Sequence, residues 1–409
     1  MKAVVFHGPG DIRLDEVPKP KLKDKTDAIV RLTLSAICGT DLHFIRGTLP
    51  GVKSGTVLGH EGVGVVESVG DEVRNFRPGD RVLIPSTVGC GYCSYCRAGY
   101  FAQCDVAPKE LGAQGTVFFG GPEEAGGLIG LQAEFARVPF ANASLVKLPD
   151  DVTDEQAILL SDIFPTGYMG AEMAEICPGN SVAVFGCGPV GQFAIASAKM
   201  MRAGRIFAID TVPSRLDMAR DQGAEAIDYN DEDPVKTIKK LTGGIGVDRA
   251  IDAVGVDANF PDRGPAARAL KTEKADFDEE VEKIAPDANP QGDQWHPGNA
   301  PSLVLEWAIE ALAKAGTLSI IGVYSGETKR FPIGNAMEKN LTINMGNCNH
   351  RKYIPMLLEV VRSGAVDPTE IITQHESVMS AIDAYEHFDK REAGWIKVVL
   401  EPEAPAKAA

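Results

Sequence analysis

Four cysteines lie within one short, glycine-rich segment of the sequence and are spaced to bind a metal. Cys90, Cys93, Cys96 and Cys104 follow the pattern C-x2-C-x2-C-x7-C. Four thiolates on so compact a loop can surround one tetrahedral Zn²⁺, whereas the spacing is too tight for strain-free disulfides among all four. An iron–sulfur cluster, which also uses four cysteine ligands, is the alternative. Since no open coordination position is implied, the predicted site is structural.

A second set of donors is dispersed along the chain. ICGTDLH contains Cys38, GHEGVG contains His60 and Glu61, and LLSDIFPTGY contains Asp162. A thiolate, an imidazole and a carboxylate provide three protein ligands and leave a fourth position for water or substrate, as a catalytic zinc requires. Each residue alone is weak evidence, because a single cysteine after apolar residues is usually a packing residue.

The segment FGCGPVG predicts a dinucleotide-binding turn. It contains Gly186, Gly188, Pro189, Val190 and Gly191 in the pattern G-x-G-x-x-G. The pattern directly follows the apolar run SVAVF and opens a helical stretch, which is the context that this motif requires. Glycines here allow a tight turn and a close approach of the backbone to a pyrophosphate facing the helix N-terminus.

Asp210 favours NAD as the dinucleotide. It ends the predicted strand RIFAID, about 20 residues after the glycine pattern. A carboxylate at this place accepts hydrogen bonds from the adenosine ribose and repels a 2′-phosphate, so NADP is disfavoured. The alternative is a doubly wound domain that binds no nucleotide.

The secondary-structure elements that must position these residues follow two different sequence patterns. Up to about residue 160 the chain has short β-type runs broken by Gly and Pro, such as AIVRLTLSAICG and EGVGVVESVG. From about residue 180, strands alternate with helices: SVAVF, QFAIASAKMMRA, RIFAID, SRLDMARDQGA, AIDYN, DRAIDAV, a helix over 302–316, and TLSIIGV. This alternation predicts an α/β fold with a doubly wound parallel sheet, beside a β-rich domain.

The predicted boundaries give a split first domain. It comprises residues 1–163 and 347–409, and the dinucleotide-binding domain comprises 164–346. A polar, proline-rich stretch at about 256–300 interrupts the sheet rhythm and is interpreted as an insertion, with a helix at KADFDEEVEKI. The insertion covers the cofactor, builds an oligomer contact, or does neither.

Composition excludes several classes of partner. The 409 residues carry a formal net charge of −16, which argues against nucleic acid because phosphate binding draws on clustered Lys and Arg. No apolar run approaches the roughly 18 residues of a membrane helix, so no membrane partner is expected. The N-terminus has no apolar signal-peptide core, and the cysteine spacing indicates metal binding. We therefore expect a cytoplasmic protein.

In this combination and order, the features resemble the zinc-containing medium-chain dehydrogenase/reductase (alcohol dehydrogenase) family over essentially the whole chain. Two segments resemble its branch related to glutathione-independent formaldehyde dehydrogenase: SDIFPTGY, where an Asp replaces the more usual Cys ligand, and NCNHRKYIP. The resemblance implies a Rossmann-type domain inserted in a GroES-like catalytic domain, with a zinc lobe at about 88–106. It also implies two Zn²⁺ per chain, a structural zinc on the four cysteines and a catalytic zinc on Cys38, His60 and Asp162.

The resemblance also implies a proton relay. Thr40 and His43 match residues that pass a proton from the zinc-bound substrate hydroxyl, through the nicotinamide ribose, to the solvent side of the protein. Zinc lowers the pKa of a bound hydroxyl, and His43 has an ordinary pKa near neutrality, suited to finish the transfer. Glu61 matches the carboxylate that lies beside the catalytic metal.

Three further residues are implied to contact the cofactor. Gly322 and Val323, in IGVY, match the strand end that lies along the nicotinamide, and Lys397 falls where the family often has a basic residue near the pyrophosphate. No equivalent of the longer cofactor-holding loop of formaldehyde-specific relatives is identified.

The expected function is reversible transfer of a hydride from an alcohol or hydrated aldehyde to NAD, in a homodimer or homotetramer. Narrower alternatives are a glutathione-independent formaldehyde dehydrogenase or dismutase, and an NAD-linked polyol or threonine-type dehydrogenase. A different class is a non-catalytic NAD-binding protein. A zinc-free reductase shares the fold but has no use for Cys38, His60 and Asp162.

Overall fold

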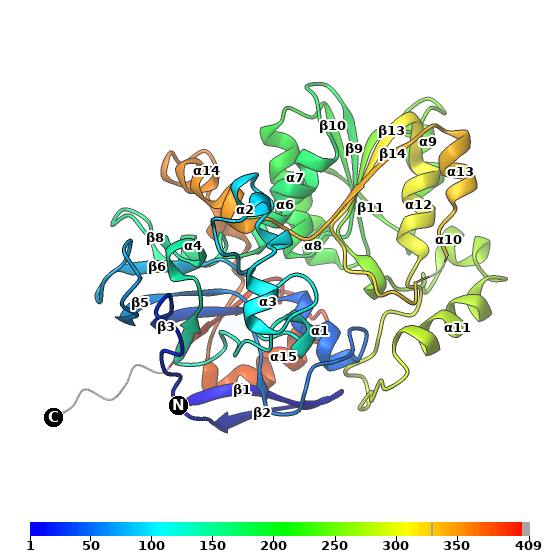
Figure 1. Ribbon diagram of the computed structural model, residues 1–409. Coiled ribbons are helices and arrows are strands. Elements are labelled where there is room, and N and C mark those ends of the chain that lie inside the picture. The colour runs from blue at the N-terminus through cyan, green and yellow to red at the C-terminus, as the bar shows by residue number, and fades with distance from the viewer. Residues whose placement is uncertain (329, 403–409) are drawn as a thin grey trace.

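The chain forms two domains in a computed structural model that describes residues 1–328 and 330–402. Figure 1 shows the first domain built from the blue-to-cyan N-terminal segments together with the orange-to-red C-terminal segments. The second domain comprises the green and yellow middle of the chain. The fold therefore agrees with the prediction of one domain inserted in another; the exact boundaries stay a prediction.

The first domain is built on β-sheets. A seven-stranded sheet has the order β15-β16-β3-β5-β6-β8, with β7 also paired to β3, and a second sheet has the order β2-β1-β4. The C-terminal β16 pairs antiparallel with β3, so strands from the N-terminal and C-terminal parts of the chain form one sheet. The strands are β1 (Lys2–Gly8), β2 (Asp11–Glu16), β3 (Ala28–Ile37), β4 (Thr56–Val57), β5 (Gly62–Val69), β6 (Arg81–Ile84), β7 (Phe135–Val138), β8 (Val146–Lys147), β15 (Gln374–Ser377) and β16 (Val398–Glu401).

Short helices connect and cover these strands. They are α1 (Gly39–Arg46), α2 (Ser94–Arg97), α3 (Ala107–Leu111), α4 (Ala141–Ser144), α5 (Asp154–Ile158), α6 (Ile163–Met173), α14 (His350–Arg362) and α15 (Ala381–Asp389), with 3₁₀ turns η1 (Phe101–Gln103), η2 (Glu123–Ala125), η4 (Pro368–Ile371) and η5 (Val378–Ser380). Helix α1 directly follows β3, and α6 lies at the junction with the second domain.

The second domain is a six-stranded parallel sheet in the order β11-β10-β9-β12-β13-β14. Its strands are β9 (Ser181–Phe185), β10 (Arg205–Asp210), β11 (Glu225–Asp228), β12 (Val247–Asp252), β13 (Leu312–Ile320) and β14 (Thr342–Met345); its helices are α7 (Pro189–Met200), α8 (Pro213–Asp221), α9 (Pro234–Leu241), α10 (Gly264–Ala269), α11 (Lys274–Ile284), α12 (Leu303–Ala311) and α13 (Ile333–Glu338), with the 3₁₀ turn η3 (Gly255–Asp257). The strand order reverses between β9 and β12, which is where doubly wound sheets bind ligands. The predicted α/β class is confirmed.

Both faces of this sheet are buried, because successive side chains of a strand point to opposite faces. Ala183 and Phe185 of β9 pack in the cluster that includes Trp307 of α12. Val182 and Val184 pack in the opposite cluster with residues of α7 and α8. This explains why SVAVF reads as a continuous apolar run.

One predicted helix is too long. The apolar periodicity over 302–316 predicts a single helix, but α12 ends at Ala311 and β13 begins at Leu312. Leu312 pairs with Val247 of β12, so pairing in the sheet extends the strand backwards into LAKAG. In a short segment of apolar and small residues, hydrophobic periodicity cannot distinguish a helix from a strand.

The insertion at about 256–300 reaches from the second domain to the first. Its helix α11 coincides with KADFDEEVEKI, as predicted. Beyond this helix, the Asn289 and Gln291 side chains donate hydrogen bonds to the carbonyls of Pro9 and Gly10, and Trp295 is buried in a core cluster of the first domain. The insertion therefore ties the two domains together.

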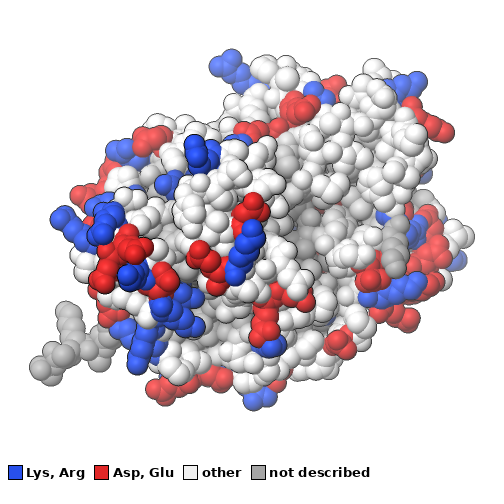
Figure 2. All heavy atoms as spheres, in the orientation of Figure 1, with Lys and Arg blue, Asp and Glu red and all other residues white. Residues whose placement is uncertain are grey.

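The described helices include none long and apolar enough to cross a membrane. On the face shown in Figure 2, basic and acidic side chains are interspersed.

Candidate functional site

Helix α1 begins at a cysteine that belongs to the predicted catalytic set. Cys38 follows β3 and occupies the N-cap of α1 in an extended conformation, with φ −118° and ψ 156°. Its backbone N–H donates to Oδ2 of Asp41 at 3.1 Å. This capping contact holds the turn, and Cys38 itself is buried.

The structure brings the four predicted donors of this set together. The ligand atoms of Cys38, His60, Glu61 and Asp162 all lie within 4.8 Å of one another. Nε2 of His60 lies 3.0 Å from Oδ2 of Asp162, and Sγ of Cys38 lies 3.9 Å from the same oxygen. Three remote segments thus converge: the β3–α1 junction, the residues before β5, and the residue before α6.

The donor cluster fits a zinc ion. Among the described residues, neither ring nitrogen of His60 has a hydrogen-bond partner, although the ring is buried. A buried imidazole left without partners is costly, and the short approach of its Nε2 to Asp162 lacks hydrogen-bond geometry. A metal between sulfur, nitrogen and oxygen donors accounts for this convergence, and three such ligands match zinc with an open position.

Asp41 approaches His60 from behind without hydrogen-bond geometry, a position that sequence reasoning missed. Its Oδ1 lies 3.2 Å from Nδ1 of His60, and its Oδ2 also accepts a hydrogen bond from Gln132 at 3.2 Å. Carboxylates in this position orient metal-binding histidines and raise their basicity. The segment ICGTDLH contains this aspartate, but the direction in which its side chain points depends on how α1 packs against the loop before β5.

His350 contacts the third ligand, and this role was missed as well. Its Nε2 lies 2.6 Å from Oδ1 of Asp162, and its Nδ1 lies 3.0 Å from Oγ1 of Thr87. Burial by itself would raise the pKa of Asp162, but His350 and His60 hold that pKa well below its usual range. The carboxylate therefore stays ionised. The motif NCNHRKYIP contains His350, and only tertiary contacts show its partner.

Glu61 forms a fully buried ion pair with Lys397. The Lys397 ammonium lies 2.8 and 2.6 Å from the two Glu61 carboxylate oxygens and also donates to the carbonyl of Ile37. Both side chains are 0% exposed. The structure thus directs Lys397 toward Glu61; its expected role near a pyrophosphate stays a prediction, although the residue also lines the central pocket.

The four cysteines of the lobe also converge. Their sulfurs lie within 4.8 Å of one another, and all four are free of disulfides. Burial raises the pKa of Cys90 to about 11, whereas at Cys93 backbone N–H donors outweigh burial and lower the pKa to about 6. Four thiolates this close need a cation, and tetrahedral thiolate sets are typical of structural zinc.

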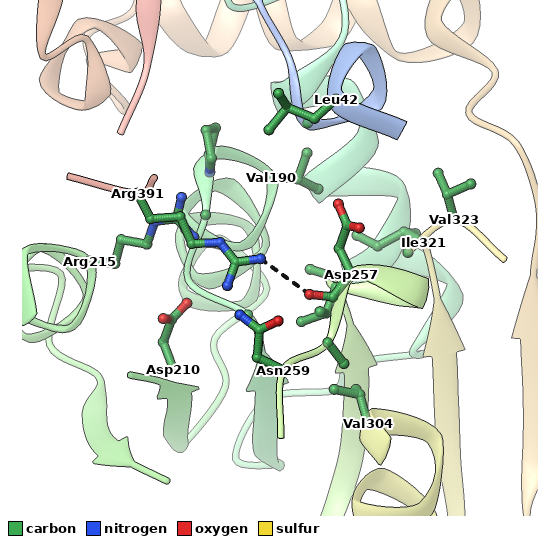
Figure 3. Close-up of a pocket in the computed structure, with 18 of the residues that line it drawn as sticks. Leu42, Val190, Asp210, Arg215, Asp257, Asn259, Val304, Ile321, Val323 and Arg391 are labelled. Carbon is green, nitrogen blue, oxygen red and sulfur yellow. Dashed lines mark hydrogen bonds between the residues drawn. The ribbon is translucent and has the colours of Figure 1, made fainter. Parts of the chain in front are cut away.

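A pocket between the domains is lined both by Cys38 of the donor cluster and by the glycine turn. Figure 3 shows this pocket with Leu42 of the first domain and Val190 and Asp210 of the second among its lining residues. The pocket is lined by most of the predicted catalytic and cofactor residues: Cys38, Thr40, His43, Gly186, Gly188, Pro189, Val190, Asp210, Gly322, Val323 and Lys397. Residues not predicted also line it, among them Arg215, Asp257 and Arg391.

The glycine turn has the close approaches that its sequence predicts. Gly186 has φ +87°, in the left-handed region that favours glycine. A Cβ on Gly191 would lie 1.9 Å from the carbonyl oxygen of Gly186, so Gly191 packs the helix against the turn. A Cβ on Gly188 would meet only Arg215, at 3.7 Å, which leaves this glycine facing the pocket. Pro189 begins α7, where its missing N–H costs nothing.

Asp210 lies at the carboxyl end of β10, where its side chain both caps the turn and lines the pocket. Oδ2 accepts a hydrogen bond from the backbone N–H of Cys187 at 2.7 Å, and Oδ1 accepts from those of Thr211 and Val212. These three donors leave one lone pair of Oδ2 free to accept a hydrogen bond from a ribose hydroxyl.

The predicted position of His43 at the solvent side is wrong. His43 is 4% exposed, because the end of α1 is covered by η3 and by the end of α15. Its Nδ1 lies 2.8 Å from Oγ1 of Thr48, and burial lowers its pKa. Thr40 is half-buried and lines the pocket; its part in a relay stays a prediction.

A doubly wound domain and a β-rich domain thus share one pocket, which is lined by the glycine turn and by Cys38 of a donor cluster that fits zinc. This arrangement defines the class of zinc-binding dehydrogenases.

Comparison with known proteins gives the family. The chain matches the family model of the alcohol dehydrogenase GroES-like domain over residues 24–150 and that of the zinc-binding dehydrogenase over residues 189–269. It is 36% identical to a zinc-type alcohol dehydrogenase-like protein of Bacillus subtilis, covering 98% of this chain and 100% of the relative. The chain belongs to the zinc-dependent medium-chain alcohol dehydrogenase family and is an oxidoreductase of the alcohol dehydrogenase type.

Two further relatives bear on the branch and the fold. The glutathione-independent formaldehyde dehydrogenase of Pseudomonas aeruginosa is 32% identical, with 100% of this chain and 99% of the relative covered. The structure of an alcohol dehydrogenase from Thermus sp. ATN1 superposes with a TM-score of 0.79 at 34% identity, covering 98% of this chain and 100% of that one.

Proposed function

We propose that this protein oxidises a primary or secondary alcohol, or a hydrated aldehyde, with NAD at a zinc ion held by Cys38, His60 and Asp162. The observation that carries the proposal is the shared pocket: Cys38 and Gly188 line the same cavity, so a substrate at the metal and a cofactor on the glycine turn can meet. A second zinc on the four clustered cysteines would be structural, since four thiolates leave no open position.

The zinc would act as a Lewis acid that lowers the pKa of the substrate hydroxyl, and the cofactor would accept the hydride. The protein residues divide the remaining work. Thr40 and His43 line the same pocket as Cys38, and in this proposal Thr40 accepts the proton of the substrate hydroxyl and passes it toward His43. The ionised Asp162 carries negative charge at the donor cluster, and Cys38, whose pKa burial raises, would become a thiolate when zinc binds. Asp41 lies 3.2 Å from Nδ1 of His60 and would orient its ring.

Glu61 and Lys397 balance each other's charge directly behind this cluster. Their opposite charges cancel, so the pair adds no net charge to the site. Both side chains are fully buried, and Lys397 holds the Glu61 carboxylate near the metal ligands. We propose that Glu61 approaches the zinc when water and substrate exchange, released in part from Lys397.

NAD is the proposed cofactor because Asp210 ends β10 and lines the pocket, and a carboxylate at this position of a doubly wound domain would accept a hydrogen bond from the adenosine ribose and repel a 2′-phosphate. Asp210, Gly188, Gly322 and Val323 line the same pocket as Cys38, so a cofactor bound along these residues could reach the donor cluster. Gly322 lies tight against Gly255: a Cβ on it would come within 2.3 Å of the Gly255 nitrogen.

Hydrated formaldehyde is a second candidate substrate. It is favoured by the similarity to the formaldehyde dehydrogenase of Pseudomonas aeruginosa and by the carboxylate ligand Asp162. An oxygen ligand donates less charge than a thiolate, which leaves the zinc a stronger Lewis acid. Hydrated formaldehyde is a geminal diol, so the same chemistry applies to it.

A screen of NAD reduction across formaldehyde, short alcohols, polyols and threonine tests the proposal. We expect reduction of NAD by at least one of these classes, and loss of that activity in Cys38→Ser. The matched control is Cys177→Ser, since Cys177 is an exposed free cysteine. NAD binding without reduction by any substrate would instead support a non-catalytic NAD-binding protein.

A further inference from the structure

Asp257 of the second domain lies against His43 of the first. It ends η3, at the start of the insertion. Its Oδ2 accepts a hydrogen bond from Nη1 of Arg46 at 2.6 Å and lies 3.6 Å from Nδ1 of His43. Among the described residues, its Oδ1 has no hydrogen-bond partner. In Figure 3 the backbone carbonyl of Asp257 receives Arg391, while its carboxylate turns toward α1, the helix of Leu42.

The surroundings of His43 decide which ring nitrogen carries the proton. Oγ1 of Thr48 lies 2.8 Å from Nδ1 of His43 and 3.3 Å from the carbonyl oxygen of the same residue. A carbonyl oxygen can only accept, so the one hydroxyl proton of Thr48 serves it, and the Thr48 oxygen is free to accept from Nδ1–H. A carboxylate 3.6 Å away also disfavours a lone pair on Nδ1. Both neighbours therefore favour the Nδ1–H tautomer, which leaves Nε2 as a proton acceptor.

Protonation of this buried ring needs a negative partner. Burial lowers the pKa of His43, the Asp257 carboxylate opposes that effect, Arg46 adds to it, and Asp41 opposes it more weakly. Asp41 is engaged at the zinc ligand His60. Asp257 is therefore the acidic group placed to support an imidazolium at His43.

We propose that Asp257 is the positioning carboxylate of His43, selecting its Nδ1–H tautomer and stabilising the ring when Nε2 takes up a proton. The inference rests on the proposed function, in which His43 receives the proton that leaves the substrate hydroxyl. In that step Nε2 gains one proton, the ring becomes a cation with both N–H groups, and Asp257 keeps its charge. His43 and Asp257 lie on different domains, so the pair exists only while the insertion holds the domains together.

The tautomer can be measured in the wild-type protein without turnover. The zinc-containing, cofactor-free protein is labelled with ring-¹⁵N histidine, and the His43 signals are assigned with His43→Gln. Above the pKa of His43 we expect Nδ1 to show the shift of a protonated ring nitrogen and Nε2 that of an unprotonated one. The reverse pattern overturns the proposal.

Two variants then separate positioning from mere stability. Arg46 binds two carboxylates, Asp257 and Asp389, and only Asp257 approaches His43. Asp257→Asn is expected to lower the pKa of His43 by about one unit, whereas Asp389→Asn leaves it unchanged although it also breaks a buried contact of Arg46.

Activity gives the last comparison. In a wild-type protein that reduces NAD, Asp257→Asn is expected to lower kcat at least about tenfold, and Asp257→Glu to recover part of it. Equal pKa values and rates in the Asn variants of Asp257 and Asp389 would overturn the inference. If the wild-type protein oxidises no alcohol, the proposed function fails, while the tautomer and pKa measurements still decide the pairing of Asp257 with His43.

Discussion

Nε2 of His350 lies 2.6 Å from Oδ1 of Asp162, and Nε2 of His60 lies 3.0 Å from Oδ2 of the same carboxylate. The two carboxylate oxygens therefore have different partners. His350 occupies one oxygen and leaves the other to the donor cluster. In the proposed zinc site, this pairing would orient Asp162 as a single-oxygen ligand.

Removing His350 should weaken the catalytic zinc. His350→Ala frees Oδ1 of Asp162 and removes the positive partner that keeps the carboxylate ionised, so zinc affinity should fall about 10- to 100-fold. Competition with a chromophoric chelator measures this. His350→Gln, which keeps a donor, should lose less, and His375→Ala, at an exposed histidine, should lose nothing. Unchanged affinity in His350→Ala would contradict this role.

The two zinc sites should respond differently to loss of one ligand. Cys38→Ser should leave about one zinc per chain and abolish turnover with little effect on unfolding, because the catalytic site is built on strands and helices that pack without it. Cys93→Ser should also lose one zinc but lower the free energy of unfolding by roughly 3–5 kcal/mol, because the lobe depends on its metal. Metal analysis and denaturant unfolding measure both. Two zincs retained in Cys38→Ser would refute the ligand assignment.

Two glycines of the dinucleotide turn should differ in what they tolerate. Gly191→Ala brings a Cβ to 1.9 Å from the Gly186 carbonyl oxygen, so the turn must shift, at a cost of about 1–3 kcal/mol, and NAD binding should weaken. In Gly188→Ala the added methyl group meets no close neighbour in the fold, so stability should be unchanged. The same methyl group should obstruct the cofactor. Thermal unfolding and NAD titration separate the two effects. Equal stability of the two variants would contradict the packing role of Gly191.

Asp210 should determine the preference for NAD over NADP. Replacing the carboxylate by the amide in Asp210→Asn removes the charge that repels a 2′-phosphate, and Arg215, close to Gly188, then favours that phosphate. We expect the ratio of kcat/KM for NAD to that for NADP to fall at least about tenfold. A wild-type protein that already prefers NADP would show that Asp210 does not have this role.

How far the site could be predicted depended on how local it is. The four lobe cysteines share one loop, so their spacing alone indicates a metal site. Cys38, His60 and Asp162 come from three remote segments, and they form a set in the sequence only through resemblance to a family. The glycine turn lies between these cases, because a strand before it and Asp210 after it provide local context.

The residues that the sequence did not predict act through contacts between distant segments. His350 is 188 positions from Asp162, and Asp257 is 211 positions from Arg46. Neither hydrophobic periodicity nor the spacing of a motif can predict a contact between residues so far apart in the sequence. The solvent-side position expected for His43 was wrong for the same reason, since it is η3 of the other domain that covers it. The helix predicted over 302–316 failed because pairing in the sheet outweighed the weak preference of LAKAG.

The most direct test of the central claim is the rate of alcohol-dependent NAD reduction before and after the catalytic zinc is removed with dipicolinate. Zinc on the four clustered cysteines is expected to remain, because four thiolates bind it, so the fold should survive the treatment. If Cys38, His60 and Asp162 hold the zinc that activates the substrate, the rate falls to background on removal and returns when Zn²⁺ is restored. An unchanged rate in protein that has lost this zinc would contradict the account.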